Sequence, residues 1–234
     1  MPRIPRVVIP GIPHHVIQRG NRRQQVFFCD EDRLYYLRLL KKYGDLLGLT
    51  IWIYCLMTNH LHLVVIPKTE QCLSEVMAIV NRKYALRINL REDWSGCLWQ
   101  SRFYSCPLDH PHTIASARYI ERNPVRAKIV ERPEDFRWSS AKAHADKTRD
   151  FLVGPCPLTE EISDWKSFIN QEDPPEMIKQ IRKNLITGRP LGDDAFIEKL
   201  EKITGRIFKR EKPGPKPKSL MADSKRFDQK EISD

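Results

Sequence analysis

The chain has 234 residues, of which 41% are hydrophobic, so it can bury the core of one generous domain and is not a disordered chain. Its 40 Lys and Arg against 30 Asp and Glu give a net charge of +10, which favours a polyanionic partner such as nucleic acid over a merely solvated basic surface. No run approaches the ~18 apolar residues of a membrane span, and the proline-rich N-terminus lacks the pattern of a signal peptide. We therefore expect no membrane partner and a cytoplasmic location.

The first third of the chain alternates strand and helix patterns. Residues 14–18 are typical of a short strand, and residues 30–48 have helical spacing of leucines, with Asp30 as the expected N-cap. Residues 50–56 and 61–66 are two β-rich runs separated by a connection of hairpin length.

The next elements complete a recognisable order. Residues 73–90 return to helical periodicity, residues 98–107 alternate as a strand, and residues 113–121 are helical up to Pro124, which disfavours helix in the residue before it. The order β, α, β, β, α, β, α predicts an α+β fold, with a ferredoxin-like (RRM-like) antiparallel sheet and helices on one face.

The composition changes after about residue 145, where prolines become frequent. We expect one domain over residues 1–145 and a mostly helical extension over residues 146–205, with short helices at 176–186 and 194–204. Residues 206–234 are basic and lack an apolar face, so they predict a mobile tail.

Two pairs of histidines are candidates for a metal site. His60 and His62 open a predicted strand, and residues two apart in a strand project to the same face, where two imidazoles can bind one divalent ion. A structural or surface pair is the commoner explanation of this spacing. His110 and His112 are a weaker rival, because the flanking prolines indicate a loop.

Tyr119 and Asn123 lie four residues apart near the end of a predicted helix, so a phenol and an amide can face one site. The ordinary alternative is a core tyrosine, with Asn123 ending the helix before Pro124. Glu121 is two residues from Tyr119 and should point away from that side.

Six basic side chains are candidates for contacts with phosphates. Three form a cluster beside the first predicted strand, where we favour phosphate contact. The other three surround the segments described above, and for them a solvated charged face is an equal alternative. The two sets are Arg19, Arg22 and Arg23, and Arg102, Arg126 and Lys128.

Four segments carry a family resemblance. Residues 57–65, MTNHLHLVV, resemble the HUH motif (His, bulky apolar, His) of transposases with a single catalytic tyrosine. Residues 118–127, RYIERNPVRA, resemble the tyrosine helix of the REP-associated tyrosine transposases, which belong to the IS200-like family. Residues 14–21 and 98–104 resemble the first and fourth strands of that family, and the whole resemblance runs from about residue 3 to 145.

The resemblance implies a sequence-specific endonuclease and strand transferase for single-stranded DNA that folds into hairpin palindromes. Tyr119 would attack phosphorus to form a 5′-phosphotyrosine and release a 3′-hydroxyl, and the reverse attack would rejoin the strand. His60, His62 and Asn123 would hold Mg²⁺ or Mn²⁺. The family implies a DNA partner, no small-molecule substrate, a monomer, and a place at the bacterial nucleoid.

Two alternatives stay open. The chain could be a domesticated protein that binds DNA hairpins without cutting them, although the presence of Tyr119 and both histidines favours the enzyme. A zinc-dependent hydrolase would need a further ligand and a general base, and the sequence has no H-E-x-x-H motif.

Overall fold

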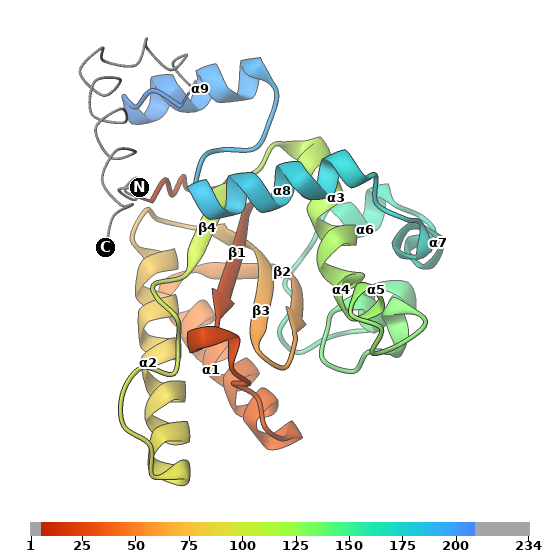
Figure 1. The fold of residues 1–234 in the computed structure, drawn as a ribbon. Coiled ribbons are helices and arrows are strands. Elements are labelled where there is room, and N and C mark those ends of the chain that lie inside the picture. Colours follow the sequence, from red (N-terminus) through yellow and green to blue (C-terminus); the bar gives the residue numbers. More distant parts are fainter. Residues whose placement is uncertain (1–5, 209–234) are drawn as a thin grey trace, which may run out of the picture.

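The computed structural model describes residues 6–208. Its centre is an antiparallel four-stranded sheet in the order β2-β3-β1-β4 (Figure 1). This arrangement confirms the predicted ferredoxin-like fold class. The strands are β1 (His14–Arg19), β2 (Leu49–Leu56), β3 (His60–Pro67) and β4 (Tyr104–Pro107).

Helices α1 (Asp30–Leu47) and α2 (Cys72–Glu92) pack on one face of the sheet. Helix α1 ends at Gly48, which has the left-handed conformation (φ 79°) that glycine adopts without steric cost. Its N-cap is Cys29 and not Asp30, because the Asp30 carboxylate pairs with Arg137 at 3.0 Å instead of capping the first turn.

The opposite face of the sheet is covered in part by α3 (His110–Glu121) and α8 (Pro175–Thr187). Two side chains of β1, three residues apart, point to opposite faces of the sheet. Gln18 accepts a hydrogen bond from Asn81 of α2 at 3.2 Å, whereas the His15 ring lies 6.0 Å from the Tyr119 ring of α3. The prediction of helices on one face is therefore correct for α1 and α2. Helix α3 adds a layer on the opposite face, where His15 lies.

The predicted strand at 98–107 is wrong in its first half, since β4 begins only at Tyr104. The indole of Trp99 donates to the carbonyl of Asn81 at 3.0 Å, and its ring packs against Tyr36 and Tyr84. These contacts hold Trp99 against α2, and the segment is joined to β1 by the Gly20–Trp99 bridge and by the hydrogen bond from Gln18 to the carbonyl of Ser101 at 3.1 Å.

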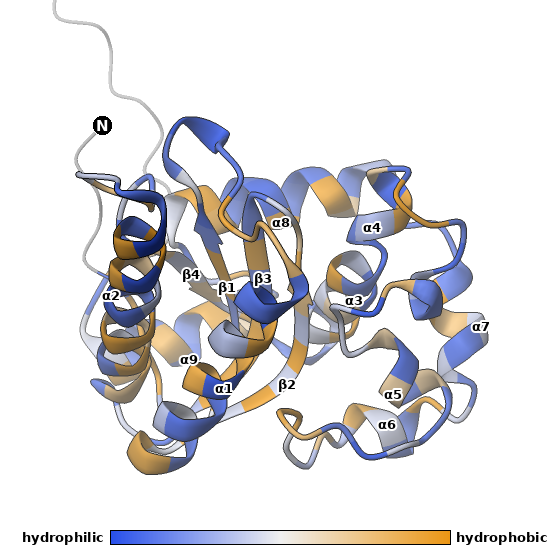
Figure 2. Cartoon of the chain, turned by 90° about the horizontal axis from the view of Figure 1, so that it is seen from below, coloured by the Kyte–Doolittle hydropathy of each residue, from blue (hydrophilic) through white to orange (hydrophobic). Residues whose placement is uncertain are grey.

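The segment after α3 is mostly helical. Its side chains up to Leu191 join the main core, whereas Leu200 and Phe208 form a second cluster with Val7 and Ile9. Trp165, Ile181 and Leu185 lie in the same hydrophobic cluster as β2 and β3, whose apolar stretches lie inside the molecule (Figure 2). The 3-10 turns are η1 (Asn21–Arg23) and η2 (Pro133–Asp135). The remaining helices are α4 (Asn123–Arg126), α5 (Ala141–Ala145), α6 (Leu158–Glu161), α7 (Trp165–Asn170) and α9 (Asp194–Thr204).

Helices α8 and α9 confirm the two helices expected at 176–186 and 194–204. The division into 1–145 and 146–205 stays a prediction. The expected tail at 206–234 lies, from residue 209 onward, outside the described residues. Within residues 6–208, no helix has both the length and the apolar character needed to cross a membrane.

Candidate active site

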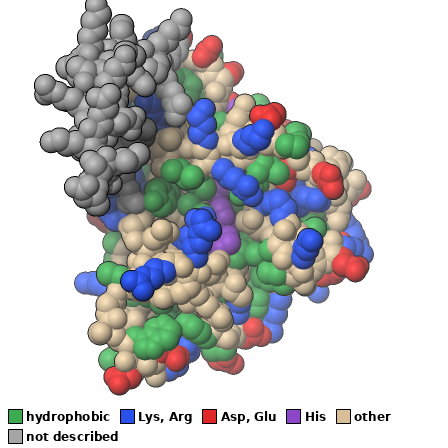
Figure 3. All heavy atoms as spheres, in the orientation of Figure 1, with side chains coloured by type: hydrophobic (Ala, Val, Ile, Leu, Met, Phe, Trp, Pro, Cys, Tyr) green, Lys and Arg blue, Asp and Glu red, His purple; other side chains and the backbone are tan. Residues whose placement is uncertain are grey.

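A cavity of about 490 Å³ opens between the sheet, α3, α4 and α8. Figure 3 shows histidine side chains at the surface on this side of the molecule, with Lys and Arg side chains around them. The predicted metal ligands and the predicted nucleophile all line the same cavity. Its polar walls include His60 and His62 of β3, Tyr119 of α3, Asn123 and Arg126 of α4, and Arg182 of α8.

Hydrogen bonds orient both histidine rings toward this cavity. Nδ1 of His60 lies 2.6 Å from Oδ1 of Asn59, and Nδ1 of His62 lies 2.8 Å from Nε2 of His15. Because an amide oxygen only accepts, His60 carries its proton on Nδ1 and keeps a lone pair on Nε2. When His62 likewise donates from Nδ1 to His15, both Nε2 atoms are left as ligands, with partners behind them that fix the rings.

Burial keeps the two rings neutral. Desolvation, and then the charge of Arg19, lower the pKa of His60 to about 4. Desolvation and the neighbouring His15 also hold the pKa of His62 well below its ordinary value. Both imidazoles are therefore uncharged near neutral pH, which is the form that binds a metal ion.

Tyr119 combines a buried ring with an accessible hydroxyl. The residue is only 5% exposed, and its ring lies 5.8 Å from the His62 ring and 4.1 Å below the guanidinium carbon of Arg126. The hydroxyl accepts a hydrogen bond from Nε of Arg182 at 3.4 Å. Tyr119 is therefore packed like a core tyrosine, and it also lines the cavity where a reactive group would be needed.

Asn123 follows the end of α3 as the first residue of α4, with Pro124 next in the chain. Its Oδ1 accepts from Nη2 of Arg126 at 2.7 Å, and the same nitrogen donates to the carbonyl of Tyr119. The other guanidinium nitrogen of Arg126 donates to Asp173 at 3.1 Å. Arg126 thus joins the two functional residues of this helix pair, and its role in DNA binding stays a prediction.

The residues present fit a divalent ion. Two neutral imidazole nitrogens are available, and the Asn123 oxygen accepts one hydrogen bond while a carbonyl has two lone pairs. The Asn123 amide nitrogen is buried without a partner, so the side chain is not fully satisfied as it stands. Among residues 6–208, no group of three His, Cys, Asp or Glu could hold a metal, and Asn123 is the amide that lines the cavity beside the two histidines.

The arginine cluster lies beside the histidines. Arg19 lines the cavity, whereas Arg22 and Arg23 are exposed on η1 with left-handed φ angles of 49° and 62°. Such angles cost free energy in residues other than glycine and are typical of functional loops. Asn59, which orients the ring of His60, also donates to the Arg23 carbonyl at 3.0 Å, so one side chain connects the loop to the histidine.

Glycine is required at the base of this loop. A Cβ at position 20 would lie 2.4 Å from the carbonyl oxygen of Gln24. The backbone amide of Gly20 donates to Asn59 at 2.8 Å, which brings the loop against the start of β3. The turn predicted after the first strand therefore holds the loop that carries Arg22 and Arg23 beside Asn59 and the start of β3.

Two predicted binding residues lie away from the cavity. Arg102 and Lys128 are exposed and are not among the residues that line it. Their contact with DNA stays a prediction.

The rival histidine pair lies in the first turn of α3 and not in a loop, so that expectation is wrong. Asp109 caps the helix by accepting from the His112 amide at 2.9 Å, and it also holds the His112 ring. His110 pairs with Glu161 at 3.0 Å. Neither histidine lines the cavity.

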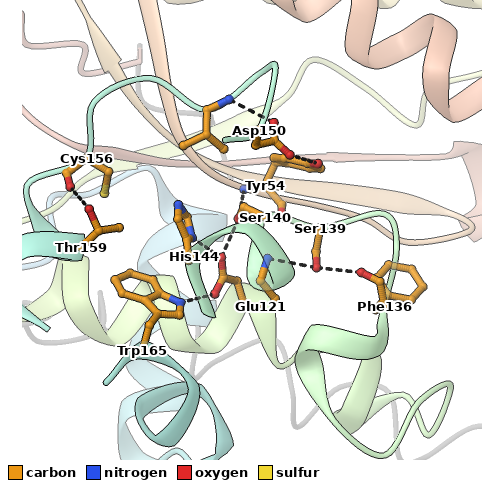
Figure 4. A network of polar contacts seen from close by, with 12 residues as sticks. Tyr54, Glu121, Phe136, Ser139, Ser140, His144, Asp150, Cys156, Thr159 and Trp165 are labelled. Atoms are coloured by element: carbon orange, nitrogen blue, oxygen red, sulfur yellow. Dashed lines mark hydrogen bonds and ion pairs between the residues drawn. The ribbon is translucent and has the colours of Figure 1, made fainter. Parts of the chain in front are cut away.

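Glu121 occupies the opposite side of α3, as predicted, in a buried polar network (Figure 4). One carboxylate oxygen accepts from Ser140 at 2.5 Å and from Nδ1 of His144 at 2.8 Å, and the other accepts from the indole of Trp165 at 2.7 Å. The side chain is completely buried. Three donors from later in the chain therefore hold the tyrosine helix in place.

Sequence reasoning missed several members of the site. His15 was part of a recognised strand, and its inward position follows from strand alternation with Ile17. Asp173 and Arg182 had no such signal, because they reach the site from about 50 to 60 residues further along the chain.

A known structure shares this fold, and a second has a weaker similarity. A REP-associated tyrosine transposase bound to a REP hairpin matches with a TM-score of 0.54 and 17% identity, over 67% of this chain and 93% of that one. A putative transposase from Deinococcus radiodurans R1 matches with a TM-score of 0.37 and 18% identity, over 51% of this chain and 96% of that one. No curated protein matches the chain significantly.

The family comparison concerns the segment that contains the candidate residues. Residues 9–123 match the model of the family described as "Transposase IS200 like". The match includes both cavity histidines and Tyr119, and it ends at Asn123. By this match, residues 9–123 belong to the IS200-like transposase family.

Proposed function

We propose that this transposase cuts and rejoins single-stranded DNA beside hairpin palindromes through a 5′-phosphotyrosine on Tyr119. His60, His62 and Asn123 would hold the divalent ion. The observation that carries the proposal is the shared cavity, because the hydroxyl of Tyr119 and the free nitrogens of the two histidines face one space.

The residues divide the work of an in-line displacement. Tyr119 supplies the nucleophilic oxygen, which bonds to phosphorus as the bond to the 3′-oxygen breaks. Arg126 fixes the ring of Tyr119 and the oxygen of Asn123 relative to each other. A bound Mg²⁺ or Mn²⁺ would polarise the scissile phosphate and neutralise its developing charge. Two imidazole ligands with one amide favour Mn²⁺ over Mg²⁺.

The basic surroundings support a DNA substrate. The chain has a net charge of +10, and Arg19, Arg22 and Arg23 lie at or beside the cavity mouth, where phosphates would approach. The hairpin as substrate is supported by the similar fold, whose solved member was bound to a REP hairpin. Action as a monomer at the bacterial chromosome stays a prediction.

A second candidate is a protein that binds hairpins without cutting them. It is favoured by one observation, the hydrogen bond from Arg126 that occupies one lone pair of Asn123. A chain in which that amide never binds a metal would keep the fold and the basic surface but not the reaction.

One gel experiment separates these functions. The full chain is incubated with a labelled hairpin oligonucleotide carrying a single-stranded flank, with Mn²⁺, and run under denaturing conditions. We expect a covalent protein–DNA band with the native chain and none with Tyr119→Phe, although both bind the hairpin. Binding without a band in the native chain would support the binding protein, and cleavage that survives Tyr119→Phe would contradict the role of the tyrosine.

A further inference from the structure

Helix α8 contributes an arginine to the cavity that lies outside the segment matched by the family model. Arg182 lines the cavity with both histidines, and its Nε donates to the hydroxyl of Tyr119 at 3.4 Å. We propose that Arg182 is a catalytic residue, which stabilises the negative charge on the attacking oxygen of Tyr119 and binds the scissile phosphate. This inference rests on the proposed function of Tyr119.

The charge balance of the site leaves Arg182 available for an anion. Arg118 and Arg126 share the buried carboxylate of Asp173, at 2.9 and 3.1 Å. No carboxylate pairs with Arg182 among residues 6–208, and its only hydrogen bond in that range is to Tyr119. A guanidinium has five donors, so the unused ones can meet phosphate oxygens in the paired geometry that arginine favours.

The contact is not needed to hold α8 in place. The helix packs through Ile181 and Leu185, which are 1% and 4% exposed, whereas Arg182 is exposed to solvent. Asn184 adds a hydrogen bond to the carbonyl of Pro190 at 2.8 Å. A purely structural role for Arg182 is therefore unsupported, and its removal should leave the fold intact.

The step balances without a further reactant. The bond between Oη of Tyr119 and phosphorus forms while the bond from phosphorus to the 3′-oxygen breaks. The phenol proton passes to solvent, and the leaving 3′-oxygen takes one up. The guanidinium of Arg182 keeps its protons throughout, and its fixed charge faces the oxygen and the phosphate where negative charge develops.

The test compares Arg182→Ala with Lys183→Gln, a matched change of an exposed cation at the adjacent position of α8 that does not line the cavity. The full chain, the labelled hairpin and Mn²⁺ are used at single turnover. For Arg182→Ala we expect the rate of the covalent adduct to fall about 100-fold, with the Kd for the hairpin within about threefold of the native value. Lys183→Gln should keep the native rate, and Arg182→Lys should recover part of it.

Chemical rescue provides a readout that a structural role would not change. Because the site is open to solvent, methylguanidinium added to Arg182→Ala should restore much of the rate, whereas equal concentrations of NaCl should not. An unchanged rate in Arg182→Ala, or a rate loss matched by the loss of binding, would overturn this inference while leaving the phosphotyrosine intact. A native chain that forms no adduct would overturn the proposed function and this inference together.

Discussion

Helix α3 carries Glu121 on one side and Tyr119 on the other, and the two side chains have opposite surroundings. Both oxygens of Glu121 accept hydrogen bonds from neutral or histidine donors, and the carboxylate is sealed from water. On the Tyr119 side, a cavity contains imidazole nitrogens and an arginine; within residues 6–208, Nε2 of His60 and of His62 has no hydrogen-bond partner and Arg182 has no carboxylate partner. One side is satisfied and holds the helix, and the other keeps unused bonding capacity for a ligand.

The residues after position 145 contribute contacts to both sides of α3. The donors that bind Glu121 include Trp165 of α7, and the carboxylate that binds Arg126 is Asp173, just before α8. Both lie beyond the segment matched by the family model. The later part of the chain therefore holds α3, and with it the proposed nucleophile Tyr119, from both sides of the helix.

The largest effect should come from His62→Ala on the open side. Loss of a metal-ligating imidazole should reduce the rate of adduct formation about 1,000-fold and remove binding of Mn²⁺, measured by electron paramagnetic resonance. His110→Ala, which changes an exposed histidine outside the cavity, is the matched control. Native Mn²⁺ affinity in His62→Ala would show that the open side does not hold a metal there.

A slightly smaller effect is expected from Glu121→Gln on the satisfied side. The amide presents donors to groups that already donate, so the free energy of unfolding should fall by about 3 kcal/mol in urea denaturation. Glu131→Gln, at an exposed position, should change it by less than about 0.5 kcal/mol. Equal stabilities of the two variants would mean that the network does not anchor α3.

Asn123→Ala tests the proposed amide ligand on the Tyr119 side of α3. It should reduce adduct formation about 10- to 100-fold through weaker metal binding, with hairpin binding nearly unchanged. Single-turnover rates and a binding isotherm measure the two quantities on the same preparation. A parallel fall of both would contradict the assignment of Asn123 as a ligand.

The smallest effect near neutral pH concerns His14, a hydrogen-bonded neighbour of His15. Its ring accepts from the amide of Ile9 at 3.2 Å and lies 2.7 Å from the carbonyl of Ile12, and desolvation lowers its pKa from 6.5 to about 4. Because the unfolded chain takes up this proton first, stability is full above about pH 6.5 and decreases down to about pH 4. We expect His14 to contribute about 1.4 kcal/mol per pH unit in that window.

Two measurements check this value. Denaturation of the native chain and of His14→Gln at a series of pH values should give a slope that is smaller by about one proton in the variant. Nuclear magnetic resonance of the His14 ring should show titration near pH 4. Titration near the ordinary value of 6.5 would contradict the burial of the ring.

Local patterns were sufficient for most of this framework. The alternation of β3 predicted that His60 and His62 share a face, and the helical repeat predicted that Tyr119 and Asn123 share a side. Residues 98–103 could not be predicted in the same way. Their alternation is real, but the bond from Trp99 to α2 determines their path, and that contact is distant in sequence.

The contacts that could not be predicted join residues that are far apart in the sequence. Arg182 and Tyr119 are 63 residues apart, and Trp165 and Glu121 are 44 apart, so no local period relates them. The same holds for the hydrogen bonds of Arg126, which was a candidate for phosphate contact only because it lies near the predicted site in sequence. Only the packing of the chain shows that both terminal nitrogens of Arg126 already donate, to Asp173, Asn123 and Tyr119.

The most direct test of the account is to identify the residue joined to DNA. The native chain is reacted with the hairpin oligonucleotide and Mn²⁺, digested with nuclease and trypsin, and analysed by tandem mass spectrometry. The account predicts a nucleotide phosphate on Tyr119, in the peptide of residues 119–122 that trypsin releases between Arg118 and Arg122. A nucleotide on any other residue, or cleaved DNA with no modified peptide, would contradict it.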